Sequence, residues 1–286
     1  MRPAARKKIV QALGFLGLRL SIALVLAVLI LLLGDIVRKG GGAISWEFLS
    51  QAPRKGMTEG GIFPAIVGTF LVTVITAAMA VPMGMSAAIY LNEYARQTRL
   101  TRLIRLSIRN LSGVPSIVYG LFGVILFVNV MRLGTSVLSA GLTLGLMTLP
   151  WTITASEEAL KTIPDSYREG ALALGATKWQ TIRTNVLPYA VPGMLTGTVL
   201  GLARAAGETA PILFTGAAFY LPFLPKSPGD QFMALPYHLY VMATQHHAIL
   251  QVRPLAYGTA LVLIVLVLGM NMAAIILRYR LRRKQR

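Results

Sequence analysis

Two charged residues, Arg204 and Glu208, stand four positions apart in an otherwise apolar stretch, residues 193–216. An isolated charge at membrane depth costs about 2.5–3.5 kcal/mol on insertion scales, so an intramembrane ion pair usually marks a polar pathway. Four residues apart on one helix, the two side chains lie on the same face and can pair. A guanidinium group presents paired donors that match the oxygens of phosphate. The pattern predicts a polar site for an anion inside a bilayer.

Alternative roles remain open for both members of this pair. Arg204 could simply lock its helix through a salt bridge, but an apolar pair would be less costly if packing alone were required. Glu208 could orient Arg204, or it could accept a hydrogen bond from a protonated phosphate oxygen, which sulfate lacks at neutral pH. We assign Arg204, Glu208 and the adjacent Thr209 to a substrate pathway.

Three glycines precede the pair at intervals of four residues. At about 100° per residue, Gly193, Gly197 and Gly201 fall on the same helical face as Arg204 and Glu208. Stripes of small residues let a second helix approach closely in a membrane. We therefore expect the charged pair to lie at a helix–helix contact.

The rest of the chain has the composition of a membrane protein. Apolar residues make up 55% of its 286 residues, and the mean hydropathy is +0.64. Six apolar runs approach the roughly 20 residues that a spanning helix needs, the first and third only with flanking residues Phe15–Arg19 and Leu111–Ser116. These runs are Leu20–Gly34, Phe63–Leu91, Ile117–Met131, Ser136–Thr154, Tyr189–Phe219 and Leu255–Leu277. The predicted fold is all-α, a polytopic membrane protein with about six transmembrane helices.

The net charge of +18 is distributed by loop rather than by surface patch. Twenty of the 28 Lys and Arg residues fall in the N-terminal segment, the second and fourth loops and the C-terminal tail. This asymmetry is the positive-inside pattern, and it predicts that both termini are cytoplasmic. It argues against nucleic-acid binding as the reason for the positive charge. Five arginines in the second loop recur every three or four residues and predict a basic helix near anionic headgroups or a partner. They are Arg96, Arg99, Arg102, Arg105 and Arg109.

Neither catalysis nor metal binding is expected of this chain. It has no cysteine, no His-Glu-x-x-His sequence and no phosphate-binding Gly-x-x-x-x-Gly-Lys-Ser/Thr sequence. His238, His246 and His247 are interpreted as outer-loop residues, and no cofactor is assigned. These absences argue against the rival class of an intramembrane enzyme.

The loop between the fourth and fifth runs, about residues 157–188, has the signals of folded structure. Pro164 interrupts a helix, and Asp165 or Ser166 can cap the next one. Gly175 can end that helix in a left-handed conformation, and Thr177 can cap another. Two short helices bent at a glycine predict a docking element rather than a linker.

This loop resembles the EAA signature of the permease subunits of ABC importers. The matching positions are Glu169, Gly170, Ala171, Gly175, Ala176, Ile182, Leu187 and Pro188. Gly170 replaces an alanine of the signature, and Ile182 stands further from Leu187 than in the consensus. Residues 110–122 and 203–211 resemble segments of phosphate-specific permeases, the second those of the PstA type.

The resemblance implies a type I ABC importer permease for inorganic phosphate in the cell inner membrane. It implies a heterodimer with a second permease of the PstC type, two cytoplasmic ATPase subunits and an extracytoplasmic phosphate-binding protein. The loop would dock on the ATPase, where ATP would be hydrolysed. Another oxyanion or a passive anion channel are the alternatives, although a channel needs no such docking loop. We divide the chain into residues 1–62, a permease core over 63–277 and a basic cytoplasmic tail over 278–286.

Overall fold

A computed structural model describes residues 3–283, and most of them lie in helices. Within residues 3–283, five helical segments are long and apolar enough to cross a membrane, and a bent pair of helices makes up to six. Small 3-10 turns lie at η1 (Gly41–Ala43) and η2 (Lys55–Met57), and π-helical turns at η3 (Tyr90–Tyr94), η4 (Val124–Val130) and η5 (Ile182–Val186). The α-helices are α1 (Pro3–Gly40), α2 (Trp46–Ser50), α3 (Phe63–Ile89), α4 (Arg99–Leu111), α5 (Ser116–Gly123), α6 (Val137–Lys161), α7 (Ser166–Ala173), α8 (Lys178–Thr181), α9 (Leu187–Ala206), α10 (Ala210–Thr215), α11 (Leu235–Thr244) and α12 (Ile249–Arg283). The prediction of an all-α membrane protein with about six spans is confirmed.

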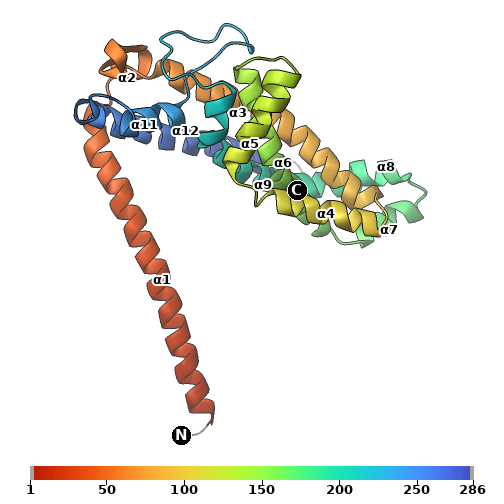
Figure 1. The fold of residues 1–286 in the computed structure, drawn as a ribbon. Helices are drawn as coiled ribbons and strands as arrows, with labels where there is room; N and C mark the ends of the chain where they lie inside the picture. The colour runs from red at the N-terminus through yellow and green to blue at the C-terminus, as the bar shows by residue number, and fades with distance from the viewer. Residues whose placement is uncertain (1–2, 284–286) are drawn as a thin grey trace.

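Helices α3, α6 and α9 form the central bundle, and α12 packs against α9 (Figure 1). Buried threonines in α3 satisfy their hydroxyl groups within the helix. Thr69, Thr73 and Thr76 donate to backbone carbonyls four residues earlier, at 2.7–2.8 Å. Thr76 also approaches the carbonyl oxygen of Gly141 on α6 at 3.2 Å. Because lipid supplies no hydrogen-bond partners, this local satisfaction lets polar residues occupy the core of a membrane bundle.

Helix α1 behaves differently from the bundle. It meets α12 near its Gly40 end and then diverges from the other helices (Figure 1). The most apolar window of its Gln11–Ala43 span is not buried by the rest of the chain. Its apolar side chains are therefore free to contact lipid or another subunit.

Helix α3 continues through Pro82 to Ile89, in line with the second run, because a spanning helix tolerates proline when its surroundings satisfy the freed carbonyl group. Two predicted boundaries were wrong. The third run does not extend back through Leu111–Ser116, since α4 and the helix from Ser116 to Val130 meet at 103°. The fifth run is also interrupted, at Gly207.

The elements at the far end of the bundle from α7 and α8 form a small cap. Strands β1 (Pro53–Arg54) and β2 (Glu59–Gly60) pair antiparallel, and α11 lies in the connection between the fifth and sixth runs. His238 lies in the same connection, where it is buried in α11 and desolvation lowers its pKa to about 4. His246 is buried too, with Nε2 2.6 Å from the carbonyl oxygen of Gly56.

Candidate functional site

The Arg204–Glu208 pair forms, but not on one continuous helix. Helix α9 ends at Ala206, Gly207 is its C-cap, and α10 begins at Ala210. Arg204 Nε donates to Glu208 Oε1 at 3.2 Å across this break. The single helix expected here was wrong, because the glycine and Pro211 at the start of α10 favour a helix end and a new start. Glu208 and Thr209 therefore lie in irregular backbone, which membranes tolerate where protein or a water-filled path surrounds it.

The Arg204 side chain lies partly open at the surface of the bundle. It is 51% exposed, whereas that of Glu208 is 16% exposed. The guanidinium carbon lies 5.5 Å from the ring centroid of Trp151 on α6. The ring and the carboxylate each hold the guanidinium from one side, and only Nε is committed to the carboxylate. Among the described contacts, the terminal nitrogens have no hydrogen-bond partner and can bind an oxyanion.

The two segments that resemble phosphate permeases lie against each other. Helix α5 lies mostly within the first segment, residues 110–122, and α10 begins at the end of the second, residues 203–211. The two helices pack against each other. Gly120 permits the approach, because a methyl group built on it would lie 3.0 Å from the Cα atom of Pro211. A cavity of only about 10 Å³ separates Arg204 from Ser112 and Val114 in the turn before α5. Segments more than 80 residues apart thus meet at one site.

The glycines of α9 face α6. A methyl group on Gly193 would lie 2.9 Å from the Cβ atom of Ala159, and one on Gly201 would lie 3.1 Å from the Thr148 side chain. A methyl group on Gly197 would overlap with Ala155. The stripe thus brings two backbones together, and this contact places Arg204 beside Trp151.

The segment between α6 and α9 forms two short helices joined at Gly175. Gly175 has φ +83°, and the amide groups of Gly175 and Ala176 donate to the carbonyls of Leu172 and Ala171. This is the Schellman arrangement, in which the left-handed residue is usually glycine. Thr177 and Gln180 then form a reciprocal capping box at the start of α8. Asp165 makes no such cap, because its Oδ1 instead accepts from Arg168 at 3.2 Å.

Large apolar side chains project from this segment. Leu174 is 90% exposed, Trp179 54% and Leu172 49%. Glu169, Gly170 and Ile182 are placed differently, with the first two exposed and Ile182 buried under the segment. Exposed apolar groups beside a rigid turn favour an interaction surface.

The wider spacing between Ile182 and Leu187-Pro188 coincides with a π-helical turn, η5. A π-helical turn holds more residues than an α-helical turn. The turn thus accommodates a longer spacing while Ile182 stays buried and α9 continues from Leu187.

An ion pair that the sequence analysis missed fixes this segment to the bundle. Arg168 on α7 donates to both carboxylate oxygens of Glu93 in η3, at 2.8 and 3.1 Å, and also to the carbonyls of Leu160 and Ile163. Glu93 is 6% exposed. The carboxylate raises the pKa of the Arg168 guanidinium. Because 75 residues separate the partners, no local pattern reveals the pair.

A second such pair corrects the interpretation of the basic stripe. Arg105 does not face headgroups or an external partner, because it donates to Glu157 on α6 at 2.9 Å and to the carbonyl of Leu91 at 2.6 Å. The other four arginines of the stripe are exposed. One arginine thus holds α4 against the bundle.

Because the resemblance implies that this turn docks on an ATPase, replacing Gly175 with Val is expected to leave membrane insertion intact and to lower ATP-driven uptake. A β-branched residue in the left-handed region is strained by about 1–2 kcal/mol or more, so the turn would change shape. The measurement is uptake by the assembled transporter against membrane abundance. Gly170→Ala is the matched control, because a methyl group there meets no atom within 4 Å. Normal transport by Gly175→Val would refute a docking role for the turn.

No group of three or more His, Cys, Asp or Glu residues that could hold a metal ion occurs among the described residues.

Residues 80–286 match the family model described as binding-protein-dependent transport system inner membrane component. A probable ABC transporter permease protein, YqgI, from Bacillus subtilis (strain 168) is 32% identical, with 92% of each chain covered. The phosphate transport system permease protein PstA 1 of Mycobacterium tuberculosis (strain ATCC 25618 / H37Rv) is 34% identical, with 93% of this chain and 86% of the relative covered.

A solved bacterial ABC transporter involved in import of the acidic polysaccharide alginate shares the fold. The TM-score is 0.64 at 13% identity, with 96% of this chain and 99% of that chain covered. The architecture is that of a type I ABC importer permease. This chain belongs to the family of binding-protein-dependent transport system inner membrane components.

Proposed function

We propose that this chain is the permease subunit through which an ABC importer moves inorganic phosphate into the cell. The observation that carries the proposal is Arg204, a half-exposed guanidinium at the break between α9 and α10, with its terminal nitrogens uncommitted. Arginine binds phosphate oxygens through paired, charge-assisted hydrogen bonds. Relatives named as phosphate transport permeases favour this anion over other oxyanions.

The partners follow from the same assignment. A second permease of the PstC type would cover the exposed side of Arg204 and complete the pathway, with Thr209 beside it. Two ATPase subunits would bind beneath the two permeases, one of them at the surface formed by Leu172, Leu174 and Trp179 of this chain. An extracytoplasmic phosphate-binding protein would deliver the substrate to the opposite end of the bundle.

The basic loops support an orientation with both termini in the cytoplasm. Helices α4, α7 and α8 would then lie on the cytoplasmic side, and α2 and α11 on the outer side. Residues 284–286 of the proposed basic tail lie outside the described residues, and Arg278 continues α12 and donates to Thr196 at 2.6 Å.

Reconstitution of the assembled complex in vesicles tests the function. Uptake of radioactive phosphate should require ATP on the side where the ATPase subunits bind, the partner ATPase itself and the phosphate-binding protein. Uptake that proceeds down a gradient without ATP would instead support an anion channel. ATP-driven uptake of another oxyanion in preference to phosphate would support the assignment as an importer and would reject phosphate as its substrate.

Replacing Glu208 with Gln is expected to lower phosphate uptake about tenfold and to leave the preference for phosphate over sulfate unchanged. The carboxylate already accepts from Arg204 Nε, so its charge-assisted bond orients the guanidinium. Competition between the two labelled anions measures the preference. A loss of discrimination would contradict the orienting role and assign Glu208 as the acceptor for a protonated phosphate oxygen.

A further inference from the structure

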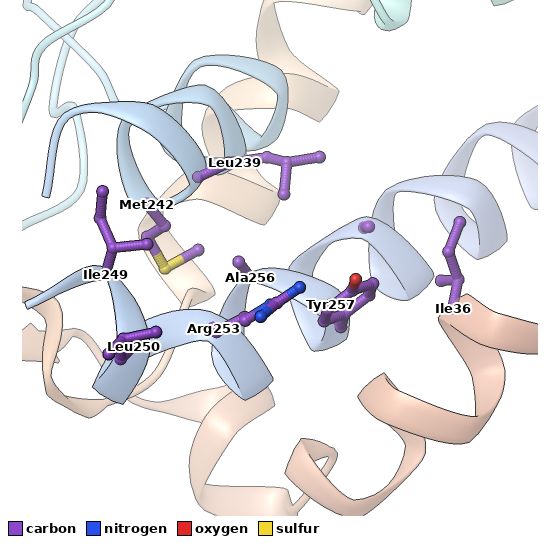
Figure 2. Close-up of a pocket in the computed structure, with 10 residues that line it drawn as sticks. Ile36, Leu239, Met242, Ile249, Leu250, Arg253, Ala256 and Tyr257 are labelled. Atoms are coloured by element: carbon purple, nitrogen blue, oxygen red, sulfur yellow. The ribbon is translucent and has the colours of Figure 1, made fainter.

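A cavity of about 500 Å³ lies between α11, the start of α12 and the end of α1. Figure 2 shows Leu239 and Met242 of α11 on one side, Ile249 and Leu250 of α12 on another, and Ile36 reaching in from α1. Its volume is in the range of small-molecule sites, which are mostly apolar with a few polar groups. It lies at the opposite end of the bundle from α7 and α8 and is separate from Arg204.

One cation is placed among these apolar side chains. The nitrogen atoms of Arg253 point along α12 towards Ala256 and Tyr257 (Figure 2). Arg253 is exposed, and within residues 3–283 it takes part in no described salt bridge. Lys39 of α1 lies 5.1 Å from the ring centroid of Tyr257 and pairs with Asp35 at 2.7 Å. Asp35 thus neutralises Lys39, and Arg253 leaves a net positive charge at the cavity.

The cavity lies where both helices change from charged to apolar sequence. The apolar run of α12 begins at Leu255, two residues after Arg253. The apolar run of α1 ends at Gly34, just before Asp35 and Ile36. In a spanning helix such a change marks the boundary between headgroups and acyl chains. A ligand in this cavity would place one part in each region.

The contact between the two helices keeps the cavity's walls in place. Gly40 of α1 crosses α12 at Tyr257 and Gly258, where a methyl group on Gly40 would lie 2.6 Å from the Tyr257 carbonyl oxygen. Close crossings through small residues fix helix pairs in membranes. The site is thus built by packing rather than by a mobile loop.

We propose that this cavity binds an anionic phospholipid of the outer leaflet, with an acyl chain along the apolar wall and the phosphate on Arg253. The apolar lining fits a hydrocarbon chain, and the guanidinium fits a phosphate group at the depth where lipid phosphates lie. This inference goes beyond the transport function and does not depend on which anion the permease moves.

Native mass spectrometry of the assembled, detergent-solubilised complex, titrated with phosphatidylglycerol, tests the site. Arg253→Gln is expected to weaken the first binding step about fivefold. Ala243→Phe, which fills the cavity from the exposed face of α11 and keeps Arg253, is expected to weaken it at least as much. Arg132→Gln removes the same charge from an exposed outer loop and should bind like the unaltered complex.

The lipid class and the source of the phosphate are tested in parallel. Phosphatidylcholine should bind more weakly than phosphatidylglycerol, and millimolar inorganic phosphate should not displace the lipid. Equal binding by all variants would overturn the proposal, as would equal affinity for the two lipids. Displacement by inorganic phosphate would also overturn it and assign Arg253 to the free anion. None of these readouts involves transport, so their failure leaves the proposed function untouched.

Discussion

Replacing Arg204 with Gln is expected to lower ATP-driven phosphate uptake about a hundredfold or more. Each hydrogen bond to a charged group contributes roughly 1.5–3 kcal/mol, and the two terminal nitrogens can make a pair of them to phosphate. A tenfold change in rate corresponds to about 1.4 kcal/mol, so losing both hydrogen bonds accounts for a hundredfold or greater decrease in uptake. Initial rates of labelled phosphate uptake in vesicles that contain the full complex measure the effect.

Three further variants separate transport from assembly. Arg204→Gln leaves Glu208, which is 16% exposed, without its partner, so the double variant with Glu208→Gln should restore assembly but not uptake. Arg204→Lys keeps the charge without the paired donors and should be intermediate. Arg132→Gln should transport normally. Intact ATP-driven uptake by a properly assembled Arg204→Gln complex would rule out the proposed pathway.

Replacing Arg168 with Met is expected to uncouple the segment that carries Gly175 from the bundle. The change leaves the buried Glu93 carboxylate with a hydrogen bond from Asn92 but without its ion-pair partner, and breaking a buried ion pair in this way costs about 3–5 kcal/mol. It also removes the donors to the carbonyls of Leu160 and Ile163. We expect at least a tenfold loss of uptake and faster hydrogen exchange over residues 160–176, with less phosphate moved per ATP hydrolysed.

The matched control is Arg183→Met, since Arg183 is an exposed arginine near the same segment. The double variant Glu93→Gln with Arg168→Met should recover much of the stability, because the unpaired buried charge is gone. It should recover little of the coupling, because the link between α7 and η3 is still missing. Hydrogen exchange and uptake that match those of Arg183→Met would show that the ion pair has no part in transmitting motion.

Arg204 and Arg168 lie at opposite ends of one continuous part of the chain, which runs from α7 to the end of α9. Arg204 lies at the end of α9, and Arg168 lies in the segment that leads into α9 through η5. Helix α9 is packed along α6 by its glycines, so a displacement of α7 and α8 would move α9 relative to its neighbours. The guanidinium of Arg204 would then become exposed to the substrate pathway or withdrawn from it as the ATPase binds ATP.

Local chemistry accounts for what could be predicted from the sequence. Hydrophobic runs fixed the membrane class, because an apolar helix of this length has no other stable environment. Gly175 and Thr177 acted through their own backbone geometry, so their left-handed turn and capping box were predictable from type and spacing. The Arg204–Glu208 pair was also predictable, since four residues of chain connect it.

Contacts between distant segments were decided by the tertiary structure. The pairs Arg168–Glu93 and Arg105–Glu157 join residues 75 and 52 positions apart, and no periodicity indicates them. The helix beyond the break at Gly207, α10, packs against α5, a segment about 90 residues away in the chain. Sequence alone determined which residues carry charge into the membrane and where the chain can turn. Only the fold decided which of those charges neutralise each other and which, like Arg204, stay available, because burial and pairing depend on neighbours that the chain brings together in space.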